Sequence, residues 1–124
     1  MLLEIDDSKT IGDLQDKFYQ CFPKLKIEFF LKKHHWEELS PEKEILPPQT
    51  LIGSIRNRHD PNLLEIKSWD KTGAVEKSFY EKLNLNVQVF FKSGRNWIQT
   101  GKSDNLTIEA LQQKSKHAEQ GVLL

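Results

Sequence analysis

The stretch Leu2-Leu3-Glu4-Ile5 returns letter for letter as Leu63-Leu64-Glu65-Ile66. Further matches follow at similar distances if one-residue gaps are allowed: Thr10 with Thr72, Gly12 with Gly73, Phe18 with Phe79, Tyr19 with Tyr80, Phe30 with Phe90 and Trp36 with Trp97. Residues 50–55 align more loosely with residues 106–111. Internal repetition has to be recognised before any motif is read, because it decides the fold. The sequence therefore predicts one domain over residues 1–118, built from two intertwined repeats, 1–61 and 62–118, with residues 119–124 as a frayed tail.

Composition sets the outer bounds on function. The chain has 124 residues, enough for one domain with its own core. Its 18 basic side chains balance its 18 acidic ones, so no long-range field favours nucleic acid or an anionic membrane. A single cysteine, Cys21, cannot form an internal disulfide, which favours a cytoplasmic location. The sequence predicts neither a signal peptide nor a membrane span.

Three patterns define the first copy. An apolar run at residues 2–5 predicts a strand. Thr10 and Asp13 then have the spacing of a capping box, and apolar residues recur at helical spacing until Pro23. Residues 25–31 alternate with a period of two, which predicts a strand whose inward side chains are Leu25, Ile27, Phe29 and Leu31. A short strand at residues 36–39 and a helical turn at residues 49–56 complete the copy.

The second copy follows the same plan. We expect a strand at residues 63–67, a helix from about Thr72 to Leu83, and a strand at residues 85–91 with Leu85, Val87, Val89 and Phe91 inward. A turn at residues 93–96 leads to a short strand at residues 97–100. Asp104 or Asn105 is expected to cap a last helix that ends near His117.

Neither copy contains the strand that would complete its own sheet. We therefore predict an α+β fold in which the two Leu-Leu-Glu-Ile strands lie antiparallel at the centre of one six-stranded antiparallel sheet. A right-handed strand-helix-strand crossover would place the long strand of one copy beside the first strand of the other. The helices are expected on one face, and the short tryptophan-bearing strands at the edges.

Residues 2–67, and more weakly the second copy, resemble a ubiquitin-like β-grasp domain. The resemblance is carried by Leu2-Leu-Glu-Ile-Asp-Asp-Ser-Lys-Thr-Ile-Gly-Asp-Leu14, a helix, two strands and a closing Leu-Leu-Glu-Ile strand. The first strand of the β-grasp hairpin is missing, and the paired glycines that conjugation requires are absent. The resemblance implies a protein-binding scaffold. A duplicated ferredoxin-like arrangement has a similar order of elements and is the alternative.

No motif indicates an enzyme, a cofactor or a metal site. The segment His34-His35-Trp36-Glu37-Glu38 gathers histidines and carboxylates, but neighbours in a strand point to opposite faces, so His34 and His35 are not expected to share an ion. Cys21 falls on the apolar side of the first helix, where we expect a buried and unreactive thiol. The sequence thus favours a non-enzymatic protein-interaction or assembly module.

Alternation places Phe30 and Phe90 on the sheet face opposite the core. Trp36 and Trp97 are expected on the neighbouring short strands. We predict that this face is a binding surface for a partner protein or a second copy of the chain, rimmed by Lys26, Lys32 and Lys92. The competing interpretation is that the rings pack under the loop at residues 40–48 or fill cross-strand pairs. The alternative function is binding of a small ligand or of single-stranded nucleic acid on the same face, although a nucleic-acid partner is not favoured.

Overall fold

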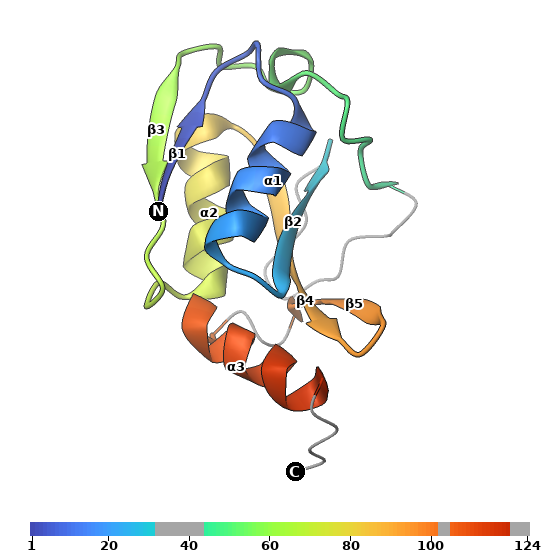
Figure 1. Cartoon of the computed structure of the whole chain (residues 1–124). Coiled ribbons are helices and arrows are strands. Elements are labelled where there is room, and N and C mark those ends of the chain that lie inside the picture. The colour runs from blue at the N-terminus through green and yellow to red at the C-terminus, as the bar shows by residue number, and fades with distance from the viewer. Residues whose placement is uncertain (32–43, 102–104, 120–124) are drawn as a thin grey trace.

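The computed structural model describes residues 1–31, 44–101 and 105–119, which form an α+β fold (Figure 1). The first half contains strand β1 (Leu2–Ile5), helix α1 (Ile11–Cys21), strand β2 (Leu25–Phe30) and the 3₁₀ helix η2 (Ile52–Ser54). The second half contains strand β3 (Asn62–Glu65), helix α2 (Thr72–Leu83), strands β4 (Asn86–Ser93) and β5 (Asn96–Gln99), and helix α3 (Ile108–Glu119). The expected short strand at residues 36–39 lies outside the described residues.

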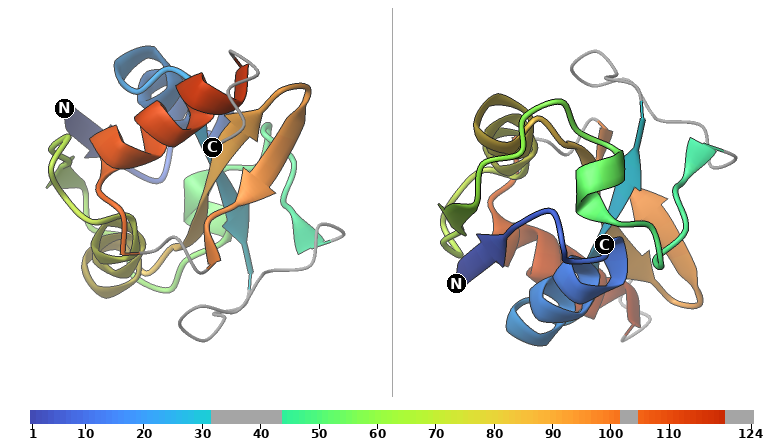
Figure 2. Two further views of the ribbon diagram at one scale, coloured as in Figure 1. Left: turned by 90° about the horizontal axis from the view of Figure 1, so that it is seen from below. Right: turned by 90° about the horizontal axis from the view of Figure 1, so that it is seen from above.

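The five described strands form two antiparallel sheets, not the predicted six-stranded one. β1 pairs with β3, as predicted for the two Leu-Leu-Glu-Ile strands. However, β2 pairs with β4, and β5 completes a three-stranded sheet in the order β2-β4-β5. The predicted contact between a long strand and the first strand of the other half is therefore wrong. The physical reason is that α1 and α2 lie between the two sheets, so the crossover from each first strand leads to the opposite side of the core (Figure 2).

The core is enclosed on all sides by these elements. The β1–β3 ribbon lies on one side and the three-stranded sheet on the other, with α1 and α2 between them. η2 and α3 close opposite ends (Figure 2). One buried cluster draws on both halves; it includes Leu3, Phe18, Ile27, Phe29, Ile52, Leu64, Phe79, Val89 and Leu111. The inward phase predicted for Leu85, Val87, Val89 and Phe91 is confirmed, since all four are buried.

The first helix begins as predicted. Thr10 is its N-cap: the Thr10 side chain accepts from the backbone N of Asp13, and the Asp13 carboxylate accepts from the backbone N of Thr10. These two bonds satisfy N–H groups that a helix start leaves open. The last helix is capped differently from the prediction. The hydroxyl of Thr107 accepts from the backbone N of Ala110, so Thr107 and not Asn105 caps α3, and Asp104 lies outside the described residues.

Backbone hydrogen bonds recur at corresponding places in the two halves. They are Ile11 N to Thr50 O and Thr72 N to Leu106 O, Ile52 N to Lys9 O and Ile108 N to Asp70 O, and Gly53 N to Asp7 O and Glu109 N to Ser68 O. In this correspondence Lys71, not Thr72, takes the place of Thr10. The matched residues Leu3 and Leu64 face each other, as do Glu28 and Gln88.

Outside the predicted binding face, two expectations about burial are wrong. Cys21, expected in the core, is exposed. It is the last residue of α1, and the aromatic ring next to it, Phe22, is the buried one. Leu31, expected to face inward, is 62% exposed because β2 ends one residue before it.

Candidate functional site

The sheet face that was predicted to bind a partner exposes less aromatic surface than expected. Phe30 and Phe90 do lie outside the main core cluster, on the side that alternation assigned to them. Each ring, however, is only 2% exposed. The prediction that these rings form an exposed anchor is therefore wrong. Phe30 lies opposite Asn86, and Phe90 lies opposite Lys26, on the neighbouring strand. Each ring therefore has a cross-strand neighbour in the sheet.

Three of the predicted residues meet on this face. The Lys26 amine lies 5.3 Å from the centre of the Phe90 ring and 4.8 Å from the Trp97 ring. Both distances fit cation–π contacts. Lys92 is the cross-strand partner of Trp97 and is half-buried. Trp36 and Lys32 lie outside the described residues. Lys26 is thus held over two rings instead of standing free at a rim.

Glu28 lies next to Lys26 on β2 and is partly withdrawn from water. Burial raises the pKa of its carboxyl, while the charge of Lys26 and a hydrogen bond from the Gln15 amide act in the opposite direction. The Gln15 side chain donates to Glu28 Oε1 at 2.6 Å and also to the carbonyl of Ile27 at 2.9 Å. These bonds tie α1 to β2. The Glu28 carboxylate and the Gln15 amide therefore have hydrogen-bond partners within the protein.

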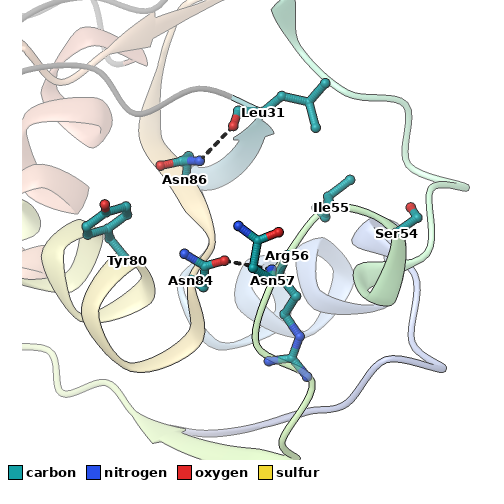
Figure 3. A pocket seen from close by; sticks show the side chains of 8 residues that line it. All are labelled: Leu31, Ser54, Ile55, Arg56, Asn57, Tyr80, Asn84 and Asn86. Atoms are coloured by element: carbon teal, nitrogen blue, oxygen red, sulfur yellow. Dashed lines mark hydrogen bonds between the residues drawn. The ribbon is translucent and has the colours of Figure 1, made fainter.

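A groove lies beside the sheet, at the point where the segment after η2 passes the end of α2 and the start of β4 (Figure 3). Its volume is about 410 Å³, within the range of small-molecule sites. Its walls come from both halves of the chain. The lining residues are Leu31, Ser54, Ile55, Arg56, Asn57, Tyr80, Asn84 and Asn86. We refer to this feature as the asparagine groove.

Asn84 fixes one wall of the groove. It follows α2 in the left-handed conformation, with φ of 57°, which asparagine tolerates better than most residues. Its backbone N donates to Tyr80 O at 3.0 Å. Its side-chain oxygen accepts from the backbone N of Asn57 at 2.8 Å (Figure 3). Asn84 therefore ends the helix and fastens the segment that connects the two halves.

Asn86 is only partly satisfied. Its side-chain nitrogen donates to the carbonyl of Leu31 at 3.1 Å. Its side-chain oxygen is buried and has no hydrogen-bond partner among the described residues. Leaving a buried acceptor unpaired costs roughly 1–3 kcal/mol, and such atoms are few in folded proteins. Because this oxygen has almost no exposed surface, a donor on a bound molecule would contact it only if the Asn86 side chain turned toward the groove.

The charged guanidinium of Arg56 does not point into the groove. Its side chain is 1% exposed, and Nε lies 2.8 Å from Asp7 Oδ1. Nη2 donates to the carbonyl of Asp60 at 3.0 Å. Figure 3 shows the guanidinium turned away from Asn84 and Asn86. The polar side chains that remain on the wall are neutral amides and hydroxyls.

Asp7 has two partners in this cluster. Besides Arg56, the Nδ1 atom of His59 lies 2.7 Å from Asp7 Oδ2. Burial raises the pKa of the Asp7 carboxyl, but the hydrogen bonds and charges of Arg56 and His59 outweigh that effect, so this pKa lies below its usual value. The three side chains hold the connecting segment against the loop after β1.

In the part of the chain that the structure describes, no three histidine, cysteine, aspartate or glutamate side chains come together as a metal site would require. His34 and His35 lie outside the described residues. The sequence patterns do not indicate the asparagine groove, because Asn57 lies in a polar stretch near the end of the first copy, Asn84 at the join between a predicted helix and a predicted strand, and Asn86 within the strand predicted at residues 85–91. The alternation in Asn84-Leu85-Asn86 between a helix and a strand was the available signal.

Comparisons of the chain with protein-family models, curated proteins and solved structures gave no match. Among the described helices, none has the length and apolar character needed to cross a membrane.

Proposed function

We propose that this protein is a non-enzymatic protein-interaction module, and that the asparagine groove binds an extended segment of a partner protein. The observation that carries the proposal is the buried, unpaired side-chain oxygen of Asn86 at the groove wall. A peptide N–H is a donor of the right kind for it. The ubiquitin-like resemblance of residues 2–67 points to the same class of protein.

The chemistry of the lining fits a peptide backbone. A primary amide carries both a donor and an acceptor, the same pair that each peptide group presents. Three asparagines line the groove, and none brings a charge that would demand a charged ligand. Leu31 and Ile55 add apolar surface for a side chain of the bound segment. A neutral, extended peptide is therefore preferred over an anionic ligand.

Nucleic-acid binding on the sheet has weaker support. It requires exposed aromatic rings on which bases stack. Phe30 and Phe90 are buried, and Lys26 is engaged with Phe90 and Trp97. We therefore place the binding function in the groove and not on the sheet face.

The proposal includes the duplication. We infer that residues 1–61 and 62–118 are two copies of one unit that complete a single domain together. The recurring backbone hydrogen bonds support this inference, as does the mutual pairing of matched residues at the centres of both β1–β3 and β2–β4. The groove then depends on both copies, because its walls come from each. We also propose that the protein works in the cytoplasm, for which the single cysteine is the support.

The test compares captured proteins. Wild-type protein, the double variant Asn57→Ala with Asn86→Ala, and a control variant, Asn96→Ala at the exposed start of β5, are immobilised and exposed to lysate of the source cell. We expect a protein that wild type and control retain and the double variant loses. Thermal unfolding confirms that all three are folded. If every retained protein binds the double variant equally, the groove is not the binding site.

A second measurement locates the contact. Peptides from the retained protein are titrated into ¹⁵N-labelled protein, and side-chain amide signals of Asn57, Asn84 and Asn86 are followed by NMR. Binding in the groove shifts these signals first. Shifts confined to β5 and Lys26 would assign the interaction to the sheet face instead.

A further inference from the structure

The β4–β5 hairpin projects from the rest of the molecule. Its turn, at residues 94–95, stands clear of α1, α2 and the β1–β3 ribbon (Figures 1 and 2). A Cβ placed on Gly94 would have no atom within 4 Å apart from its chain neighbours. Arg95 and Asn96, next along the chain, are exposed. The turn and its side chains are therefore open to a partner.

Basic side chains flank one aromatic ring of this hairpin. Lys92 on β4 lies opposite Trp97 on β5. The Lys26 amine, on β2, lies 4.8 Å from the centre of the Trp97 ring. Arg95 stands at the turn, two positions before this ring. We refer to Lys26, Lys92, Arg95 and Trp97 as the hairpin surface.

Helix α3 brings further cations to the same end of the molecule. The Ser115 hydroxyl donates a hydrogen bond to the carbonyl of Lys92, which fixes the helix beside the hairpin. The Lys114 amine lies 5.0 Å from the centre of the Phe91 ring, which precedes Lys92 on β4. Lys114 and Lys116 are both exposed. Their charges add to those of the hairpin surface.

Acidic side chains are concentrated away from this end. Residues 85–101 contain neither aspartate nor glutamate. Glu28 interacts with the charge of Lys26, but Lys92 and Arg95 have no ion-pair partner among the described residues. Other carboxylates belong to the β1–β3 ribbon and its adjoining loops: Glu4, Asp6, Asp7, Asp60, Glu65 and Asp70. A chain of zero net charge therefore has a basic end.

We propose that the hairpin surface binds a short acidic segment of a partner protein, with carboxylates on both sides of an aliphatic residue. The guanidinium of Arg95 can hold one carboxylate through two parallel hydrogen bonds, and the Lys92 amine pairs with a second. The half-exposed indole of Trp97, beside Lys92, offers apolar contact to the aliphatic side chain. This surface shares no residue with the asparagine groove, and neither proposal depends on the other.

A nucleic acid fits the hairpin surface less well. Proteins that bind single strands combine a basic track along the backbone with aromatic rings on which successive bases stack. Here Trp97 is the one aromatic residue of the surface, and Lys26 lies over its ring. The cations are confined to one end of the molecule, so they offer no track for a long polyanion. Charge and length together select a short acidic segment.

The test titrates a capped peptide in which glutamate and leucine alternate into the ¹⁵N-labelled full chain and follows the backbone amide signals by NMR. We expect the signals of residues 92–97 to shift first. A glutamine-leucine peptide of the same length should bind about tenfold more weakly, because it forms no ion pairs. Arg95→Glu reverses one charge at the exposed turn and should weaken binding of the acidic peptide by about fivefold. Lys82→Glu is the matched control. It makes the same change of net charge in the last turn of α2, at the opposite end of β4 from the hairpin, and should leave binding unchanged.

The wild-type measurements decide the matter even if Arg95→Glu fails to fold. Absence of binding by the glutamate-leucine peptide, equal binding of the glutamine-leucine peptide, or shifts confined to the asparagine groove would overturn the proposal. So would equal weakening by Arg95→Glu and Lys82→Glu, which would show attraction by net charge alone. A single-stranded oligonucleotide is titrated in parallel. If it binds more tightly than the acidic peptide and shifts the same signals, the hairpin surface binds nucleic acid and the proposal is wrong.

Discussion

Leu3 on β1 and Leu64 on β3 are direct cross-strand partners, and both side chains are 2% exposed in the same core. Each belongs to a different half of the chain. Neither strand has another described strand beside it. The ribbon that closes one side of the core therefore exists only when both halves are present.

The first prediction follows from this dependence. Residues 1–60 alone retain β1 and β2 but lose β3 and β4, the strands that pair with them. We expect this fragment to be unfolded as a monomer, with a narrow range of amide shifts in its NMR spectrum. Circular dichroism at low concentration provides the check. A well-dispersed spectrum from the monomeric fragment would show that one half folds without the other.

The second prediction concerns the inward faces of the two long helices. Phe18 and Phe79 are fully buried at corresponding positions of α1 and α2. Truncating either to alanine should lower the free energy of unfolding by about 3–5 kcal/mol, because the change removes buried area and leaves a cavity. Tyr19 is 47% exposed, so Tyr19→Ala serves as the control and should cost less. Urea denaturation measures all three. Equal losses of stability in all three variants would mean that the two phenylalanines do not lie on the buried faces of the helices.

The third prediction is about acid. The folded-state pKa of Asp7 lies below its usual value of 3.8. The unfolded chain therefore takes up this proton first as the pH falls, so the stability that Asp7 contributes is present above pH 3.8 and is lost progressively below it. Asp7→Asn should remove this part of the acid dependence. Unfolding midpoints in urea of the wild type and of Asp7→Asn, measured from above pH 3.8 to below it, test whether the stability falls with pH in this way.

The same variant should also be less stable at neutral pH. It leaves the Arg56 guanidinium, whose side chain is 1% exposed, without the carboxylate at 2.8 Å. Asp60→Asn is the matched control, because Asp60 contacts Arg56 through its main-chain carbonyl. If the control loses as much stability as Asp7→Asn, the ion pair is not the cause.

Local features of the fold were accessible from the sequence, whereas its assembly was not. The capping box at Thr10 and the alternation along β4 depend on residues close together in the chain, and both are confirmed. The pairing of β2 with β4 depends on segments about sixty positions apart, and alternation does not choose a partner for a strand. Phe30 illustrates the difference: its side of the sheet was predictable, but its burial was not.

The candidate sites were still harder to predict. Asn86 falls on the polar side of the strand predicted at residues 85–91, and its role at the groove arises only because tertiary contacts bring Leu31 and the segment after η2 to it. The hairpin surface likewise forms only because the fold brings Lys26 to Trp97 and α3 to Lys92. Both sites are defined by tertiary structure and not by local sequence.

The last prediction uses one half as a template for the other. Lys71 stands at the N-cap of α2, where Thr10 stands at the N-cap of α1, but its side chain makes no capping hydrogen bond. Its backbone is extended, with φ of −71° and ψ of 141°, a conformation that a capping residue adopts. Lys71→Ser should therefore supply a missing acceptor to the first turn of α2 and raise the free energy of unfolding by roughly 0.5–1 kcal/mol. Thr10→Ala should lower it by about 1 kcal/mol, because it removes an existing cap. Lys71→Ala is the matched control, since it removes the same long side chain without adding an acceptor. Urea denaturation of the three variants separates the effects. If Lys71→Ser is no more stable than Lys71→Ala, the start of α2 does not accept the cap that the start of α1 uses, and the two helix starts are not equivalent.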